Sequence, residues 1–200
     1  KLFHMLIIME HFKIIHPTKT GGTYVSDTLV AHNIIPPPSD HHDPICRLYP
    51  NPIITLRDPS HRFKSMYKYW RFGGQKYSGG KPTGSVDDFI YAITTDRSQL
   101  HTSCTWGAHA EPQTHWISPQ DFSNTIIVRY TEDMSIQLTK LLEYLKIPVG
   151  IISSCRINKS NGSVFNLTND QQIFVDTFYQ KDFELWHKVN NNPDLFRHVI

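Results

Sequence analysis

The sequence predicts an α/β protein with a central parallel sheet flanked by helices. Three short apolar runs are each followed by a helical pattern, and the chain has no internal repeat and no run of like charges. Continuous apolar runs are typical of strands that are buried on both faces of a parallel sheet. Because strands and helices alternate, we expect the connections to be crossovers whose helices cover the sheet.

The expected strands are residues 12–16, 52–56 and 125–130. Apolar side chains at the spacing of one helical face follow each strand. After the first strand these are Val25, Leu29 and Val30; after the second, Phe63, Met66, Tyr67 and Trp70; after the third, Met134, Leu138, Leu141, Leu142 and Leu145. Pro148 is expected to end the third of these helices.

Two further helices are expected where a hydroxyl residue stands three positions before an acid or an amide. Ser85 with Asp88, and Thr168 with Gln171, have the sequence of a capping box at a helix start. The helix after Thr168 is expected to run toward Trp186. The expected loops are 33–51, 73–84 and 153–166. Loops at strand ends are where open α/β sheets bind ligands.

Composition favours one folded domain. The chain has 200 residues, 39% of them hydrophobic, and a net charge of +2 with its 12 histidines counted as neutral. The near balance of charge argues against a strongly basic nucleic-acid binder, and no apolar run approaches the roughly 20 residues that span a bilayer. We expect an N-terminal segment over residues 1–11, partly not native, and a single domain over residues 12–200. With three cysteines, no CxxC pair and no recognisable signal peptide, the cytoplasm is favoured over the Golgi lumen.

The most informative segment, 16–23, reads His-Pro-Thr-Lys-Thr-Gly-Gly-Thr between an expected strand and an expected helix. Gly21 and Gly22 let the chain turn closely, so that consecutive N–H groups can point at one anion. The start of a helix adds partial positive charge, and Lys19 adds a full one. The segment is therefore typical of a phosphate-binding loop.

This segment differs from the Walker A loop of ATP- and GTP-binding proteins. That loop is GxxxxGK[ST], with lysine after the glycines, whereas Lys19 precedes the glycine pair here. Thr20 and Thr23 add hydroxyl donors that an anion could use. The alternative interpretation is an ordinary tight turn between a strand and a helix.

A second cationic motif follows the second expected strand. It reads Leu-Arg-Asp-Pro at 56–59, and Pro59 favours a helix start. The Arg57 guanidinium can bind a phosphate with two parallel hydrogen bonds, and Ser65 adds a hydroxyl about two helical turns later. Arg57 alone is equally well explained by a surface pair with a neighbouring carboxylate.

Together the two motifs resemble those of sulfotransferases that use 3′-phosphoadenosine 5′-phosphosulfate (PAPS), most of all glycan O-sulfotransferases of the heparan sulfate 2-O type. The first motif is similar to the family's loop for the 5′-phosphosulfate, although Thr18 stands where the family usually has proline. The second is similar to its 3′-phosphate site. The resemblance covers residues 12–186, and later segments carry it as well: 127–134, 158–160 and 179–186.

The resemblance implies a P-loop-like sulfotransferase fold, PAPS as donor, 3′-phosphoadenosine 5′-phosphate (PAP) as product, and no required metal. It implies that Lys19 contacts the transferred group and the leaving phosphate, while Arg57 and Ser65 hold the 3′-phosphate. The implied nucleotide-binding residues are Lys19, Thr20, Gly21, Gly22, Thr23, Arg57, Ser65, Lys159 and Ser160.

An in-line sulfuryl transfer needs a base for the acceptor hydroxyl. The segment 39–43, between the two motifs, reads Ser-Asp-His-His-Asp, and histidine titrates near neutrality. Similar family members have a histidine base in this interval. We therefore predict His42 as the base, with His41 as second choice; solvent-facing histidines and a metal site are the alternatives.

Basic and aromatic residues alternate over 62–74, which suits an anionic sugar acceptor, and part of this stretch resembles a segment of glycan 2-O-sulfotransferases. The aromatic face is better explained as core, which leaves Lys68 and Arg71 as candidates for the acceptor. The segment 109–116 resembles a family loop near the acceptor and adds His109 and His115. We expect a hydroxyl-bearing acceptor, most of all a glycan, and no nucleic acid or membrane partner.

Two other functions compete with sulfotransfer. The first is a P-loop-like ATP-dependent kinase, against which the missing Walker A pattern and the Arg57–Ser65 spacing argue. The second is a non-catalytic module that binds anionic glycans and has kept only the fold.

Overall fold

The computed structural model describes residues 12–35, 51–73, 84–95, 110–117, 122–131, 133–149 and 165–200. The chain divides into two compact units. The first comprises Lys1–Arg57, Gln113–Ile157 and Leu185–Ile200, and the second comprises Asp58–Pro112 and Asn158–Glu184. No helix among the described residues is long and apolar enough to cross a membrane.

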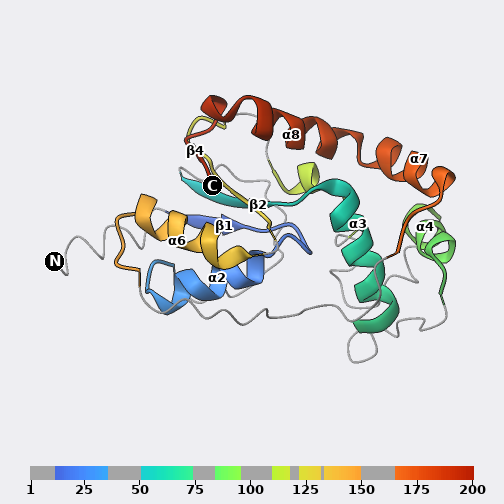
Figure 1. Ribbon diagram of the computed structural model, residues 1–200, viewed down its shortest axis with the longest axis horizontal. Helices are drawn as coiled ribbons and strands as arrows, with labels where there is room; N and C mark the ends of the chain where they lie inside the picture. Colours follow the sequence, from blue (N-terminus) through green and yellow to red (C-terminus); the bar gives the residue numbers. More distant parts are fainter. Residues whose placement is uncertain are drawn as a thin grey trace. The chain divides into compact units, whose positions relative to one another are not determined.

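The first unit is built on a four-stranded sheet in which all pairs are parallel (Figure 1). The strands lie side by side in sequence order: β1 (Lys13–Ile15), β2 (Pro52–Leu56), β3 (Ile126–Arg129) and β4 (His198–Val199). The prediction of an α/β protein with a parallel sheet is confirmed. β2 has the predicted bounds, and β1 and β3 are one residue shorter at each end. β4 was not predicted, because two residues carry no periodic pattern.

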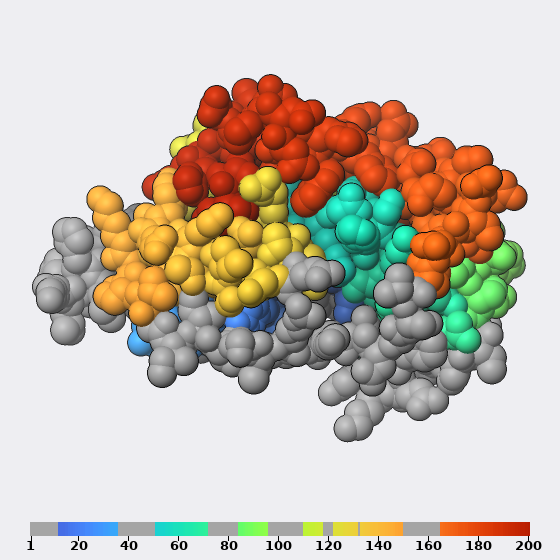
Figure 2. All heavy atoms as spheres, in the orientation of Figure 1, coloured from blue at the N-terminus to red at the C-terminus, as the bar shows by residue number. Residues whose placement is uncertain are grey.

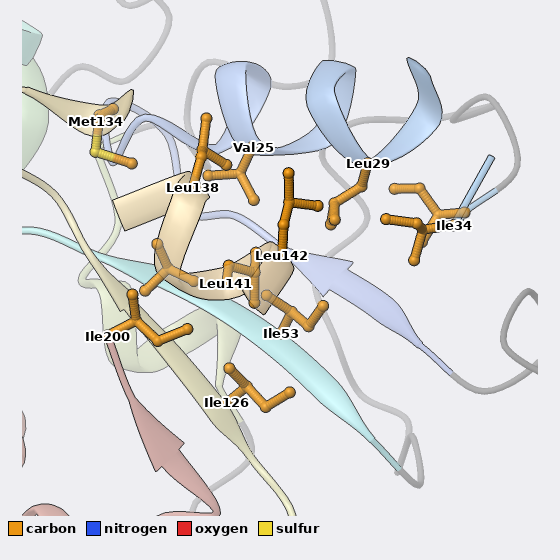
Figure 3. Packing of buried hydrophobic residues seen from close by; sticks show 12 residues of the cluster. Val25, Leu29, Ile34, Ile53, Ile126, Met134, Leu138, Leu141, Leu142 and Ile200 are labelled. Atoms are coloured by element: carbon orange, nitrogen blue, oxygen red, sulfur yellow. The ribbon is translucent and has the colours of Figure 1, made fainter. Parts of the chain in front are cut away.

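Two helices, α2 (Gly22–Ala31) and α6 (Met134–Tyr144), pack together against the sheet (Figure 3). Their inward side chains meet apolar residues of the strands in one cluster. Its labelled members are Val25, Leu29, Ile34, Ile53, Ile126, Met134, Leu138, Leu141, Leu142 and Ile200. The predicted helical faces are therefore confirmed as core. This core holds α2 against the sheet, and the turn 16–21 joins the end of β1 to the start of the helix.

Helix α6 is amphipathic and forms part of the molecular surface (Figure 2). Leu138, Leu141 and Leu142 are fully buried, whereas Ile136 is 52% exposed. The helix ends at Tyr144, before Pro148, because Lys146 adopts a left-handed backbone with φ 56°. The end of the helix is within one residue of Leu145, the last member of the predicted apolar face, and Pro148 lies beyond it.

The second unit has an aromatic core between α3 (Pro59–Lys68), α4 (Val86–Thr94) and α7 (Asn169–Phe178). The side chains predicted to share one face of α3 and its π-helical extension (Tyr69–Gly73) are all buried in it: Phe63, Met66, Tyr67 and Trp70. Phe89 of α4 packs on Phe63 with ring centroids 5.5 Å apart. The interpretation of these aromatic residues as core is confirmed.

Both predicted capping boxes are present, at Ser85 and at Thr168. The single helix expected after Thr168 is instead two helices, α7 and α8 (Gln180–Asn191), which meet at Tyr179. The Tyr179 side chain is buried and donates a hydrogen bond to the carbonyl of Ala110 at 2.7 Å. Neither glycine nor proline marks this break, so it has no local signal in the sequence.

Leu142→Ala should lower the free energy of unfolding by about 2–5 kcal/mol, because it opens a cavity between α6 and the sheet. Ile136→Ala removes an exposed side chain of similar size from the same helix, and its effect should stay within about 0.5 kcal/mol. Urea denaturation of both variants measures the difference. Equal losses would contradict the packing of α6 on the sheet.

Candidate functional site

The candidate site lies at the carboxyl-terminal edge of the sheet. His16 follows β1, Arg57 follows β2 and Tyr130 follows β3, and these three strands are neighbours. The N–H of Tyr130 donates to the carbonyl of Leu56 at 2.6 Å, so the pairing of β2 and β3 continues to this point. Ligands of open α/β sheets bind at this edge.

The turn from β1 into α2 has the backbone of an anion-binding loop. Lys19 and Gly21 are left-handed, with φ values of 62° and 81°, and Thr20 between them is not. Alternation of this kind turns successive N–H groups toward one point. Gly21 is also the N-cap of α2: its carbonyl accepts from the N–H groups of Tyr24 and Val25, and it supplies no side-chain cap. The positive end of the helix therefore faces the turn.

The two glycines are required by close approaches as well as by backbone angles. A Cβ atom on Gly21 would lie 2.8 Å from Cδ2 of Tyr130, and one on Gly22 would lie 1.9 Å from Cβ of His16. Carbon atoms in contact are ordinarily about 3.5–4.0 Å apart, so neither position accepts a side chain without a shift of its surroundings. The tight turn thus depends on both residues.

Thr20 anchors the turn to the sheet. Its side chain is fully buried, and its Oγ1 donates to the carbonyl of Pro17 and lies 2.6 Å from Oγ1 of Thr55 in β2. This hydroxyl therefore has internal partners, and its predicted contact with a ligand stays a prediction. The N–H of Thr20 stays a candidate contact. Thr23 is half-buried in the first turn of α2.

Arg57 approaches the turn from β2. Its Nη1 donates to the carbonyl of Lys19 at 3.2 Å, and its guanidinium carbon lies 4.0 Å from the centroid of the Tyr130 ring. A cation over an aromatic face is attracted by the ring. The same ring lies against Gly21, so Tyr130 contacts both parts of the site. The two predicted cationic motifs are brought together here.

The electrostatics of the site favour an anion. Burial, and secondly the positive charge of Arg57, lower the pKa of Lys19 from 10.5 to about 8. Both causes oppose the charged form of Lys19, and the opposite charge of a bound anion would favour it. The left-handed backbone of Lys19 adds a further cost, of about 1–3 kcal/mol for a residue that is not glycine.

Ser65 belongs to the second unit, whereas Arg57 and the turn belong to the first. It lies on α3 in the second unit and is buried, so its pairing with Arg57 stays a prediction. Lys68 and Arg71 belong to the same unit, where Arg71 donates to the Tyr67 hydroxyl at 2.9 Å. His115 is exposed in the first unit. The remaining predicted residues lie outside the described residues: His41, His42, His109, Lys159 and Ser160.

Two residues that contact Arg57 were not predicted from the sequence. Tyr130 stacks on its guanidinium, and Gln113 hydrogen-bonds its main chain. Tyr130 could have been found as the last residue of the third predicted strand, at the sheet edge where Arg57 follows the second. Gln113 carried no such signal, because it lies 56 residues from Arg57 in a short 3-10 helix (Gln113–Trp116).

Comparisons of the chain with known protein families, with curated proteins and with solved structures found no match.

We predict that Lys19 titrates near pH 8, as measured by NMR of its side-chain carbons. Arg57→Gln should raise this pKa, because one of its two causes is removed, but not fully to 10.5, because burial is the larger cause. Lys140→Gln makes the same change of charge at an exposed position of α6 and should leave Lys19 unaffected. An unchanged pKa in Arg57→Gln would contradict the proximity of the two cations.

Proposed function

We propose that this protein is a PAPS-dependent O-sulfotransferase and that the turn 16–23 holds the 5′ end of the donor. The observation that carries the proposal is the convergence of two cations on one backbone loop. Arg57 reaches the main chain of Lys19 at 3.2 Å, in a turn whose N–H groups and helix start already favour negative charge. A nucleotide with anionic groups at both its 5′ and its 3′ position could contact both cations at once.

Several features favour a sulfuryl donor over ATP. Lys19 precedes the glycine pair, whereas the lysine of an ATP-binding P-loop follows its glycines. Two motifs resemble those of PAPS-dependent enzymes. They are Lys-Thr-Gly-Gly-Thr, and Arg-Asp-Pro with a serine eight residues after the arginine. We therefore also propose that the parallel sheet belongs to the P-loop-like sulfotransferase fold.

The residues of the turn have the chemistry that such a donor requires. PAPS supplies the sulfuryl group, and PAP is the product. Lys19 would contact the transferred group and balance the charge that develops on the leaving phosphate. The N–H groups of the turn would hold the 5′-phosphate, while Arg57, with Ser65, would hold the 3′-phosphate. Lys159 and Ser160 are proposed to cover the nucleotide.

The acceptor side of the reaction rests on the resemblance. A histidine base takes the proton of the acceptor hydroxyl as the sulfuryl group is transferred in line. His42 is proposed for this role, with His41 as the alternative. Lys68, Arg71, His109 and His115 are proposed to contact the acceptor, for which a carbohydrate hydroxyl is the best candidate because lysine and arginine pair with the anionic groups of charged glycans.

Lys19→Ala should reduce sulfate transfer from PAPS on the order of 100-fold or more, because it removes a preorganised charge from the leaving group. A screen of glycans and small hydroxyl compounds with labelled PAPS first identifies an acceptor. Lys140→Ala, at an exposed position of α6, is the matched control and should retain full activity. In the wild-type protein, affinity for PAP should fall as pH rises through about 8, because Lys19 then loses its charge.

Two outcomes of this experiment would favour the other functions. Equal binding of ATP and PAP, with phosphate transfer and no sulfate transfer, indicates a kinase. Binding of an anionic glycan that needs no nucleotide and survives Lys19→Ala indicates a non-catalytic module.

Arg57→Ala should remove the preference for PAP over 5′-AMP. These nucleotides differ by the 3′-phosphate, to which the arginine is proposed to donate two hydrogen bonds. We expect the affinity for PAP to fall roughly tenfold or more and the affinity for 5′-AMP to change little, as measured by calorimetry. A similar loss for both nucleotides would place Arg57 at the 5′-phosphate.

A further inference from the structure

The side chain of Gln113 hydrogen-bonds both polar main-chain groups of Arg57. The N–H of Arg57 donates to Oε1 of Gln113 at 2.9 Å, and Nε2 of Gln113 donates to the carbonyl of Arg57 at 2.8 Å. The side-chain amide of Gln113 therefore accepts from the N–H of Arg57 and donates to its carbonyl. The peptide groups of a neighbouring strand make the same kind of hydrogen bonds. Arg57 is the first residue beyond β2, so this pairing extends the order of the strand by one residue.

Gln113 makes these hydrogen bonds in the interior. It is 2% exposed, and a buried amide is costly unless its polar atoms are paired. An apolar side chain could fill the same volume, but it would leave the N–H and the carbonyl of Arg57 without these two partners. The amide of Gln113 thus supplies two hydrogen bonds to Arg57 that an apolar side chain of the same size could not.

The direction of the Arg57 side chain follows from where its main chain is fixed. The guanidinium contacts the carbonyl of Lys19 at one side and the ring of Tyr130 at another. Both contacts lie on elements other than β2, so a shift of the Arg57 main chain moves the guanidinium relative to both. Bidentate hydrogen bonding by arginine depends on the direction of its planar group.

We infer that Gln113 is a positioning residue that fixes the Arg57 guanidinium beside the turn 16–23 and thereby sets its contact with a bound phosphate. The effect on phosphate binding rests on the proposed function, whereas the placement of Arg57 does not. Gln113 need not touch the ligand itself. The inferred role is therefore exerted entirely through Arg57.

The first test measures the placement of Arg57 without any ligand. Gln113→Met keeps the size of the side chain and removes both hydrogen bonds. The pKa of Lys19, read by NMR, should rise toward that found in Arg57→Gln, because the charge of Arg57 moves away. Gln137→Met is the matched control, since Gln137 is also a buried glutamine of the first unit and lies on α6. The control should leave Lys19 unchanged.

The second test measures anion binding and uses PAP and inorganic pyrophosphate as probes. Gln113→Met should weaken the binding of PAP roughly tenfold in the wild-type background and hardly at all in Arg57→Ala. A general loss of stability would instead act equally in both backgrounds. If Gln113→Met does not fold, Gln113→Asn keeps the polarity but is too short to reach both groups of Arg57, and it should act in the same direction.

A folded Gln113 variant in which the pKa of Lys19 is unchanged would overturn the inference. An equal loss of PAP binding with and without Arg57 would overturn it as well. If Lys19 shifts as expected but the wild-type protein binds neither PAP nor pyrophosphate, the positioning role stands and the proposed function fails.

Discussion

The contact of the Arg57 guanidinium with the main chain of Lys19 is the constraint on which the site depends. It exists because β1 and β2 are parallel neighbours whose carboxyl ends meet at one edge of the sheet. Two cations held this close repel each other, and burial adds to the cost of charging Lys19. The fold therefore stabilises an arrangement that is unfavourable by itself and that a bound anion would improve.

The rest of the site supports this contact from several directions. Thr20 ties the turn to Thr55 in β2, and Gln113 fixes the main chain of Arg57. The ring of Tyr130 lies against both Gly21 and the guanidinium, so the turn and Arg57 cannot move independently without losing one of these contacts. Preorganised charges and dipoles of this kind need no rearrangement when a ligand binds.

Much of the fold could be predicted because it rests on local patterns. The bounds of β2, the start of α3 at Pro59 and both capping boxes depend on residues that are adjacent or three positions apart. The break at Tyr179 could not be predicted, since it coincides with a buried hydrogen bond to Ala110, 69 residues away. β4 is a strand because it pairs with β3, and its two residues are too few to show the hydrophobic pattern of a strand.

For the site, the sequence by itself determined the chemistry of the turn: a lysine, two glycines and a helix start after a strand, with an arginine after a later strand. These features depend on residue type and short spacing, which a sequence shows directly. Only the tertiary structure decided that Thr20 anchors the turn and that Tyr130 and Gln113 hold Arg57. The physical reason is that such contacts join strand ends and loops that are far apart along the chain. Which of these residues become neighbours depends on the pairing of the strands.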